Sequence, residues 1–224
     1  SILKTRAKPL GIIIDVQPVG EALADDYFGG LLCYPSSSGM VRDLTDDIAV
    51  IHDAGGLAVV CADLLALTLL APPGEMGADI VVGSAQRFGV PFSFGGPHAA
   101  YFACSQALQR SIPGRIVGVS RDSNGKPAYR LALQTREQHI RREKATSNIC
   151  TAQALLAIMA SFYAVWHGPE GLKDIAAHSN QQARRFGAAM IASGRSLRHE
   201  SFFDTVVIET GDDRDNLLAT ASAA

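Results

Sequence analysis

The sequence predicts an α/β fold with a mostly parallel sheet and helices on both of its faces, followed by the start of a smaller α+β domain. Short apolar runs alternate with helical patterns along the first hundred residues. Two long helical patterns then precede a new strand-like run. With 224 residues, of which 47% are hydrophobic and 19% charged, the chain is able to bury a sizeable core.

The first elements alternate between strands and a helix. Gly11–Val16, Phe28–Tyr34 and Leu57–Ala62 are runs of apolar and branched residues, and we expect each to form a strand. Between the last two, Asp43–His52 opens with capping residues and ends before two glycines, which predicts a helix. Its apolar residues share one face: Leu44, Ile48 and Ile51.

The central stretch places a long loop between two short apolar runs. Ile80–Val82 and Ala99–Ala103 are expected as buried strands of the sheet. The loop between them is rich in glycine and proline, which favour close backbone approach and fixed turns. Because α/β folds bind ligands beyond strand ends of this kind, the loop is either a ligand site or a tight crossover.

The second half of the chain predicts a hairpin and then helices. Asn124-Gly125 lies between the apolar runs Arg115–Ser120 and Ala128–Leu133, which is a strong β-hairpin signal. A stripe of Met and aromatic residues then runs at helical spacing from Thr146 or Ser147 to Gly168, and we interpret it as core.

A second helix is expected to begin at Pro169 and to end at Gly194, and Phe203–Glu209 is expected as a strand. We therefore predict a large α/β domain at 1–145, a connecting helix at 146–168 and the start of a small α+β domain at 169–224.

Two polar segments each have two interpretations. The hydroxyls of Pro35–Gly39 could hold an anion, or the segment is a solvated turn. Gln134–Lys144 carries three arginines and a lysine among two glutamates. It is either a solvated segment with offsetting charges or a mobile arm that presents basic side chains to a carboxylate or phosphate. The arm would present Arg136, His139, Arg141 and Arg142.

Composition excludes several classes of function. A formal charge of -2 gives no attraction to nucleic acid or anionic membranes, and no apolar run reaches the ~18 residues of a membrane span. Four widely spaced cysteines fit reduced thiols and predict neither a metal site nor a disulfide framework. The beginning and end of the sequence predict a fragment of a longer polypeptide.

Three segments carry a family resemblance. Gly83–Pro91, Gly95–Ala99 and Leu133–Cys150 closely resemble the amino-terminal half of glycine dehydrogenase (decarboxylating), the P-protein of the glycine cleavage system. The resemblance implies a pyridoxal-phosphate enzyme of the aspartate aminotransferase-like fold, fold type I. Such an enzyme decarboxylates glycine and passes the aminomethyl group to the lipoyl arm of the H-protein. It also implies a homo-oligomer or heterotetramer, in the cytoplasm of a bacterium or the mitochondrial matrix of a eukaryote.

The segment lacks the groups that this coenzyme needs. A Schiff base requires a lysine, and the ring nitrogen requires a carboxylate. None of the five lysines lies in the loop that follows Ile80–Val82, and the resemblance puts Gln86 at the expected lysine position. The expected aspartate falls near Val60, and Asp63 comes three residues later. We therefore interpret the segment as the half that binds no coenzyme and has no catalytic residue.

Our hypothesis is that this half packs against the catalytic half, in the same chain or as a separate subunit, and completes the mouth of its active site. The candidates for that mouth are Gln86, Arg87, His98, Arg136, His139, Arg141 and Arg142. Two alternatives stay open. One is a directly catalytic enzyme that uses Lys126 or Lys144, and the other is a purely structural module for oligomerisation.

Overall fold

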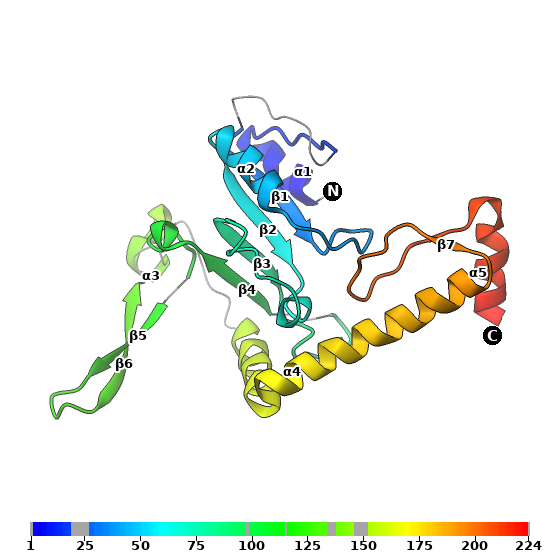
Figure 1. Ribbon diagram of the computed structural model, residues 1–224. Helices are drawn as coiled ribbons and strands as arrows, with labels where there is room; N and C mark the ends of the chain where they lie inside the picture. Colours follow the sequence, from blue (N-terminus) through cyan, green and yellow to red (C-terminus); the bar gives the residue numbers. More distant parts are fainter. Residues whose placement is uncertain are drawn as a thin grey trace.

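The computed structural model describes residues 2–18, 27–96, 99–114, 116–133, 138–145 and 152–223. A four-stranded sheet lies at its centre, a hairpin projects from one side, and one long helix runs beneath the sheet (Figure 1). The elements in chain order are α1 (Ile2–Ala7), η1 (Lys8–Leu10), β1 (Gly29–Tyr34), α2 (Thr45–Asp53), β2 (Leu57–Ala62), η2 (Ala66–Thr68), β3 (Ile80–Ser84), β4 (Ala100–Cys104), η3 (Gln106–Leu108), β5 (Ile116–Arg121), β6 (Pro127–Leu133), α3 (Gln138–Arg141), η4 (Arg142–Lys144), α4 (Ala152–Ala192), β7 (Ser196–Leu197), β8 (Ile208–Glu209), η5 (Gly211–Asp213) and α5 (Arg214–Ala223).

The central sheet has the strand order β1-β2-β3-β4. The first three strands are parallel, and β4 runs antiparallel to β3. The mostly parallel α/β sheet predicted from the sequence is therefore confirmed. The sequence did not indicate that β4 reverses direction, and β4 is mostly exposed instead of buried.

One face of this sheet, which we call the closed face, is covered by α2. The helix begins after Asp43, whose Oδ1 accepts a hydrogen bond from the Thr45 backbone N–H at 2.8 Å and so caps the first turn. The apolar side chains predicted for one face of the helix are buried against alternate residues of the strands. This core contains Leu44, Ile48 and Ile51 of the α2 region and Tyr34, Ala58, Val60, Ala62 and Val81 of the sheet.

The other face of the sheet, which we call the open face, has no helix packed on it within the described chain. The side chains that alternate with the core residues point to it, and Leu31, Leu57 and Phe102 keep 46%, 41% and 45% of their surface exposed. Cys33 and Cys61, which are neighbours in the register of β1 and β2, are also exposed there. Helices cover only one face of the sheet in the described residues.

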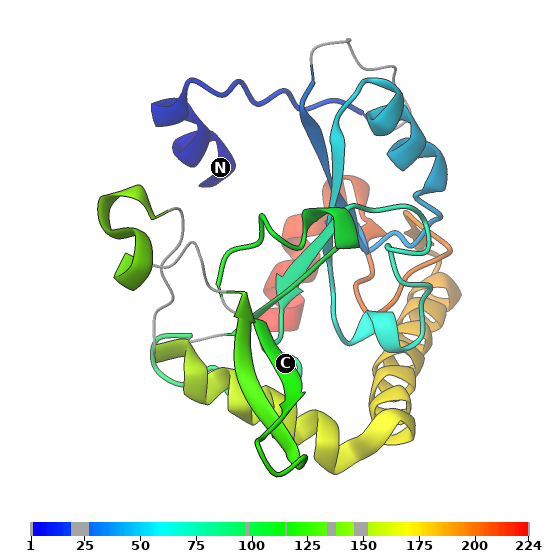
Figure 2. The same ribbon diagram turned by 90° about the vertical axis from the view of Figure 1, so that its left-hand side faces the viewer.

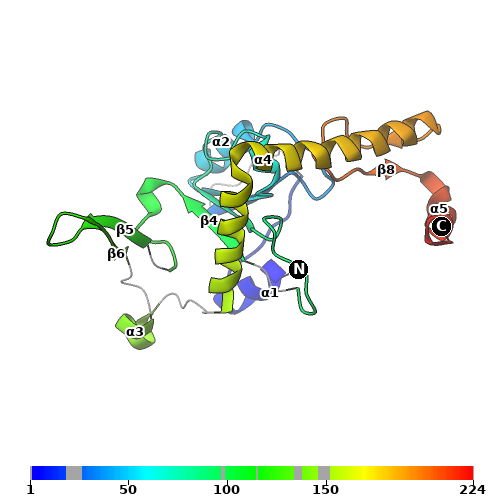
Figure 3. The same cartoon turned by 90° about the horizontal axis from the view of Figure 1, so that it is seen from below.

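Two features of the second half match their predictions closely. The hairpin of β5 and β6 turns at Gly125, whose φ of 78° is the left-handed conformation that the Asn-Gly signal predicts. The helix α4 bends at Gly168, where φ is 65° and ψ is 178°, and Pro169 begins its second part (Figure 3). The domain boundary predicted near this bend stays a prediction.

Two strand predictions are wrong over most of their length. Residues 12–18 form no strand, because no strand of the described residues lies beside them, and Ile13 and Val16 are exposed. Of Phe203–Glu209, only Ile208 and Glu209 form a strand, paired with β7. In the rest of this segment, Phe203 is buried and its carbonyl accepts a hydrogen bond from Asn180, and the Val207 carbonyl accepts one from the Arg198 backbone N–H at 2.9 Å. Among the described helices, none combines the length and apolar character needed to cross a bilayer.

Candidate functional site

The segments that follow β1, β2 and β3 meet at one edge of the sheet. Because these strands are parallel and in register, their carboxyl ends lie side by side, with Tyr34 opposite Ala62 and Cys61 opposite Val82. This carboxyl edge is where sheets of this class bind ligands. The segments that follow the strands there are 35–39 after β1, Asp63 after β2, and the turn with Gln86 and Arg87 after β3.

Arg87 is held between two carboxylates. Its Nη1 lies 2.5 Å from Asp63 Oδ2, and its Nη2 lies 2.6 Å from Asp204 Oδ2. Its guanidinium carbon also lies 5.3 Å from the centre of the Phe203 ring. Partial burial acts against the charge, but the two carboxylates outweigh it, so the pKa of Arg87 lies above its ordinary value. We call Asp63, Arg87 and Asp204 the edge cluster.

The other oxygen of Asp63 is used as well. Oδ1 accepts hydrogen bonds from the backbone N–H groups of Leu65 and Ala66, at 2.9 and 3.2 Å. Asp63 therefore caps the turn before η2 while it binds Arg87. A coenzyme nitrogen would have to share this carboxylate with all three of these donors.

Residues 199–205, which we call the edge segment, cover the same edge. Phe203 is 2% exposed and packs with Leu65, Ala66 and Ala176. The side-chain amide of Asn180 on α4 donates to the carbonyl oxygens of Phe202 and Phe203 at 3.1 and 2.5 Å. The carboxyl edge is thus filled by protein in the described chain.

The serine-rich turn after β1 is part of this packing. Ser36 Oγ and Ser38 Oγ are 3.0 Å apart, and Ser38 Oγ lies 2.8 Å from His199 Nε2 in the edge segment. Ser36 Oγ also accepts a hydrogen bond from the Met40 backbone N–H at 3.1 Å. These hydroxyls contact the protein's own groups, which favours the interpretation as a turn over an anion site.

The two positions expected to bear coenzyme groups are part of ordinary structure. Val60 is fully buried in the core beneath α2. Gln86 lies in the tight turn after β3, where its backbone N–H donates to Ser84 Oγ at 3.1 Å and its carbonyl accepts from Val90 N–H at 3.1 Å. Lys126 and Lys144 are exposed, in the hairpin turn and in η4, and neither lies in the turn after β3.

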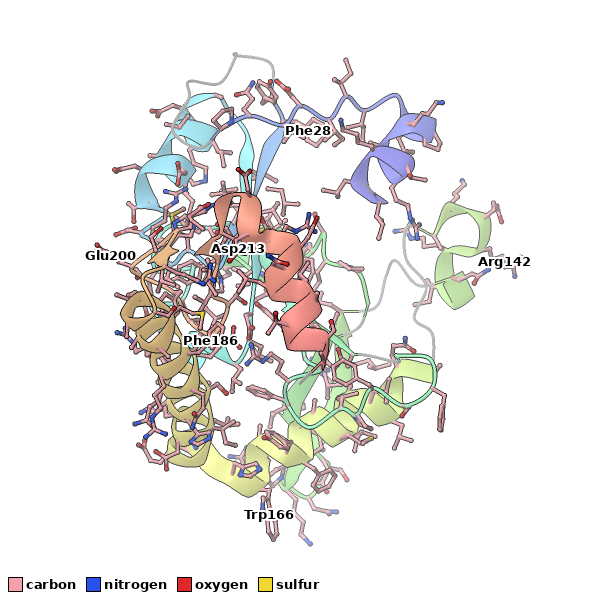
Figure 4. All side chains as sticks on the ribbon, turned by 90° about the vertical axis from the view of Figure 1, so that its right-hand side faces the viewer. Phe28, Arg142, Trp166, Phe186, Glu200 and Asp213 are labelled. Carbon is pink, nitrogen blue, oxygen red and sulfur yellow. The ribbon has the colours of Figure 1, made fainter. Side chains whose placement is uncertain are left out.

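The predicted basic arm is described in part. Arg141 ends α3 and Arg142 begins η4, and Figure 4 shows Arg142 at the periphery of the molecule. His98 and Arg136 lie outside the described residues, as does the side chain of His139. Figures 1 and 2 place α3 apart from the carboxyl edge, so the described part of the arm is separate from the edge cluster.

Arg142 has an unusual backbone. Its φ of 52° is in the left-handed region, which costs a residue with a Cβ about 1–2 kcal/mol. Such strain is found most often where a side chain serves a function, because the surrounding structure must hold it. The left-handed backbone therefore singles out Arg142 among the described residues of the arm.

Sequence reasoning missed Asp204 and the edge segment. Nothing in the local pattern around Asp204 marks it as the partner of an arginine 117 positions earlier. In the part of the chain that the structure describes, no group of three or more His, Cys, Asp or Glu side chains is placed to hold a metal ion.

Comparison with known proteins identifies the family. The family model of the glycine cleavage system P-protein matches residues 1–224. A glycine dehydrogenase (decarboxylating) from Bradyrhizobium sp. strain BTAi1 is 58% identical over 224 residues, which is 100% of this chain and 23% of the relative. One from Rhodopseudomonas palustris strain BisA53 is 58% identical over 222 residues, 99% of this chain and 23% of the relative. The chain thus spans about a quarter of the length of these relatives.

Solved structures agree with this assignment. An inhibitor-bound glycine decarboxylase (P-protein) superposes with a TM-score of 0.79 at 36% identity, over 85% of this chain and 45% of that chain. An aspartate aminotransferase from Thermus thermophilus superposes with a TM-score of 0.56 at 18% identity, over 92% of this chain and 57% of that one, which shows the fold alone. The predicted aspartate aminotransferase-like fold is confirmed, and the chain belongs to the glycine cleavage system P-protein family.

Proposed function

We propose that this chain is the non-catalytic part of a glycine dehydrogenase (decarboxylating). In this proposal the parent enzyme decarboxylates glycine with pyridoxal phosphate and passes the aminomethyl group to the lipoyl arm of the H-protein. Another part of the enzyme holds the coenzyme. The names of the curated relatives and of the P-protein structure support the reaction. Because these curated relatives are bacterial, the proposal places the enzyme in the cytoplasm.

The carboxyl edge is the observation that carries the proposal. Pyridoxal phosphate needs an amine at this edge and a carboxylate facing its ring nitrogen. The turn after β3 has Gln86 and no lysine, and Asp63 is bound to Arg87 and to the backbone of η2. The described residues of the edge therefore do not fit the coenzyme, and we derive no chemical step through it here.

What this part contributes is a supporting surface. We propose that it packs against the catalytic part and completes the mouth of that active site. The arm with Arg141 and Arg142 is the described candidate for contact with the glycine carboxylate, the coenzyme phosphate or acidic residues of the H-protein. Gln86, His98, Arg136 and His139 remain part of this proposal. Arg87 does not, because its guanidinium is already held by two carboxylates.

The location of the coenzyme tests the first half of the proposal. Borohydride reduction of the full enzyme fixes the coenzyme to its lysine, and peptide mapping finds that residue. We expect the adduct on a lysine outside residues 1–224. An adduct on Lys126 or Lys144 would establish the directly catalytic alternative instead.

The basic arm is tested by substitution in the full enzyme. Arg142→Ala removes the charge, and Arg142→Gly removes the charge while it suits the left-handed backbone. Loss of a charge-assisted hydrogen bond of about 1.5 kcal/mol lowers turnover or H-protein affinity about tenfold in both variants. The coenzyme absorbance stays unchanged.

Arg185→Ala, at an exposed arginine of α4, is the matched control and should have no effect on either quantity. If both Arg142 variants match the wild type in turnover and H-protein affinity, Arg142 has no part in the mechanism. A change in assembly alone would favour the purely structural module.

A further inference from the structure

We propose that the β5–β6 hairpin is a docking arm whose apolar face is buried against the remainder of the parent polypeptide. This inference rests on the proposed function, because it names a surface through which the non-catalytic part meets the rest of the enzyme. It assigns a task to a segment that neither the carboxyl edge nor the basic arm uses.

The two faces of the hairpin differ in chemistry. Val117 lies opposite Leu131 and Val119 lies opposite Tyr129, so these four side chains share one face. Val117, Val119 and Tyr129 keep 59%, 77% and 80% of their surface exposed. The other face carries small or polar residues: Gly118, Ser120, Ala128, Arg130 and Ala132. Only one face therefore has the character of an interface.

Hydrogen bonds in the turn fix the conformation of the hairpin. The Asp122 carboxylate accepts hydrogen bonds from the backbone N–H groups of Asn124 and Lys126, at 2.8 and 2.9 Å. Arg121 Nη1 donates to the Gly125 carbonyl at 2.7 Å. A turn with this many contacts fixes the register of the strands, and the register decides which residues share the apolar face.

The hairpin has no support within the described chain. An isolated two-stranded hairpin is marginally stable in water and needs a further strand or an apolar surface to pack on. Among the described elements, β5 packs closely only against β6, and β6 packs closely only against β5. Figures 1 and 3 show it projecting away from the sheet and from α4, and six residues of strand reach about 20 Å.

The remainder of the parent polypeptide is the occupant that fits best. The curated relatives are about four times as long as this chain, and all of that length is present in the same molecule. An intramolecular partner has a high effective concentration and needs no second encounter. Arg121 and Lys126 lie at the turn end of the apolar face, so the matching surface is an apolar patch with carboxylates at that end.

A pair of cysteine substitutions in the full enzyme tests the buried face. Val119→Cys places a thiol on the apolar face, and Ala132→Cys places a matched thiol on the other face. Maleimide labelling is measured at each position by peptide mass spectrometry. We expect labelling of the native enzyme to be at least about tenfold slower at position 119 than at 132, and equal once the enzyme is unfolded in urea. Equal rates in the native enzyme would overturn the proposal.

A photo-crosslinker identifies what covers the face. We would replace Tyr129 with p-benzoylphenylalanine in the full enzyme, which keeps an aromatic ring at this position. A crosslink to a peptide outside residues 1–224 supports the docking arm. A crosslink within residues 1–224, whether to the same chain or to a second copy, overturns it, and so does the absence of any crosslink.

These results are independent of the coenzyme mapping. A coenzyme adduct on a lysine of this chain, together with slow labelling at position 119, would contradict the proposed function and support the docking arm. An adduct elsewhere in the enzyme, together with equal labelling at positions 119 and 132, would contradict the docking arm and support the proposed function.

Discussion

The two faces of the central sheet come from the same four strands and yet have opposite surroundings. On the closed face, α2 buries Ile48 and Ile51 against Val60, and each of these residues is at most 4% exposed. On the open face, Leu31, Leu57 and Phe102 keep more than 40% of their surface exposed. Parallel sheets of α/β proteins are normally covered on both sides. The closed face is therefore packed within this chain, and we expect the open face to be covered by other parts of the proposed parent enzyme.

The first half of α4 also leaves apolar side chains exposed. The stripe interpreted as core from the sequence is only partly packed, since Leu155, Phe162 and Trp166 are exposed within the described chain. Figure 4 shows Trp166 projecting outward. A shallow apolar groove of about 440 Å³ lies there between Gly89 and the helix, lined by Met159 and Tyr163 among others. These surfaces are consistent with a segment that is a part of a larger packed body.

The largest expected effect contrasts the two faces directly. Ile48→Ala empties a fully packed site and should lower the free energy of unfolding of the isolated chain by about 2–5 kcal/mol in urea titrations. Leu31→Ala, on the open face, should lower it by less than about 1 kcal/mol. In the parent enzyme, where we expect the open face to be covered, Leu31→Ala should approach the effect of Ile48→Ala. Equal losses of unfolding free energy for Ile48→Ala and Leu31→Ala in the isolated chain would contradict the difference between the closed and open faces.

A middle-sized effect is expected at the edge cluster. Arg87→Met keeps the length of the side chain but leaves the half-buried carboxylates of Asp63 and Asp204 without their cation. We expect a loss of about 1–3 kcal/mol in thermal or urea unfolding. Arg198→Met breaks an exposed ion pair with Glu209 and serves as the control, with little change expected. An equally small loss of unfolding free energy in both variants would mean that the edge cluster does not stabilise the fold.

The smallest expected effect is a pH dependence of the closed face. Burial, followed by the nearby Cys61 and Asp63, raises the pKa of Tyr101 to about 12 from an ordinary value of 10.0, and its hydroxyl donates to the Ala62 carbonyl at 2.9 Å. Because the folded pKa is the higher one, the contribution of Tyr101 is complete below pH 10 and is lost as the pH rises toward 12.

Tyr101→Phe should therefore lower stability by about 1 kcal/mol at pH 7 and should flatten the decline between pH 10 and 12. Tyr129→Phe, on the exposed hairpin, is the control. Parallel alkaline profiles for the wild type and Tyr101→Phe would contradict this assignment.

Local signals predicted much of the fold. The spacing of Leu44, Ile48 and Ile51 predicted α2, Asn124-Gly125 predicted the hairpin, and Gly168 with Pro169 predicted the bend in α4. Each of these depends on residues close in sequence. Gly11–Val16 was predicted as a strand from composition alone, but a strand also needs a neighbour, which the described chain does not supply.

Only part of the carboxyl edge could be predicted from the sequence. The sequence placed Asp63, Gln86 and Arg87 after strands of one sheet, so their proximity followed from the parallel order. Asp204 comes from the far end of the chain, and its approach to Arg87 depends on how α4 leads back to the sheet. No short-range pattern contains that information. The reversed direction of β4 was missed for the same reason.

The edge cluster has a consequence for motion. Arg87 ties the sheet to Asp204, and the backbone N–H of Val41 donates to the Ser201 carbonyl at 3.0 Å beside it. Swinging residues 199–205 away would break at least one charge-assisted bond and one neutral bond, about 2–4 kcal/mol in total. A swung-out form would then account for no more than a few molecules in a hundred. Residues 199–205 are therefore expected to stay on the carboxyl edge, and larger movements of the proposed parent enzyme are expected in its other parts.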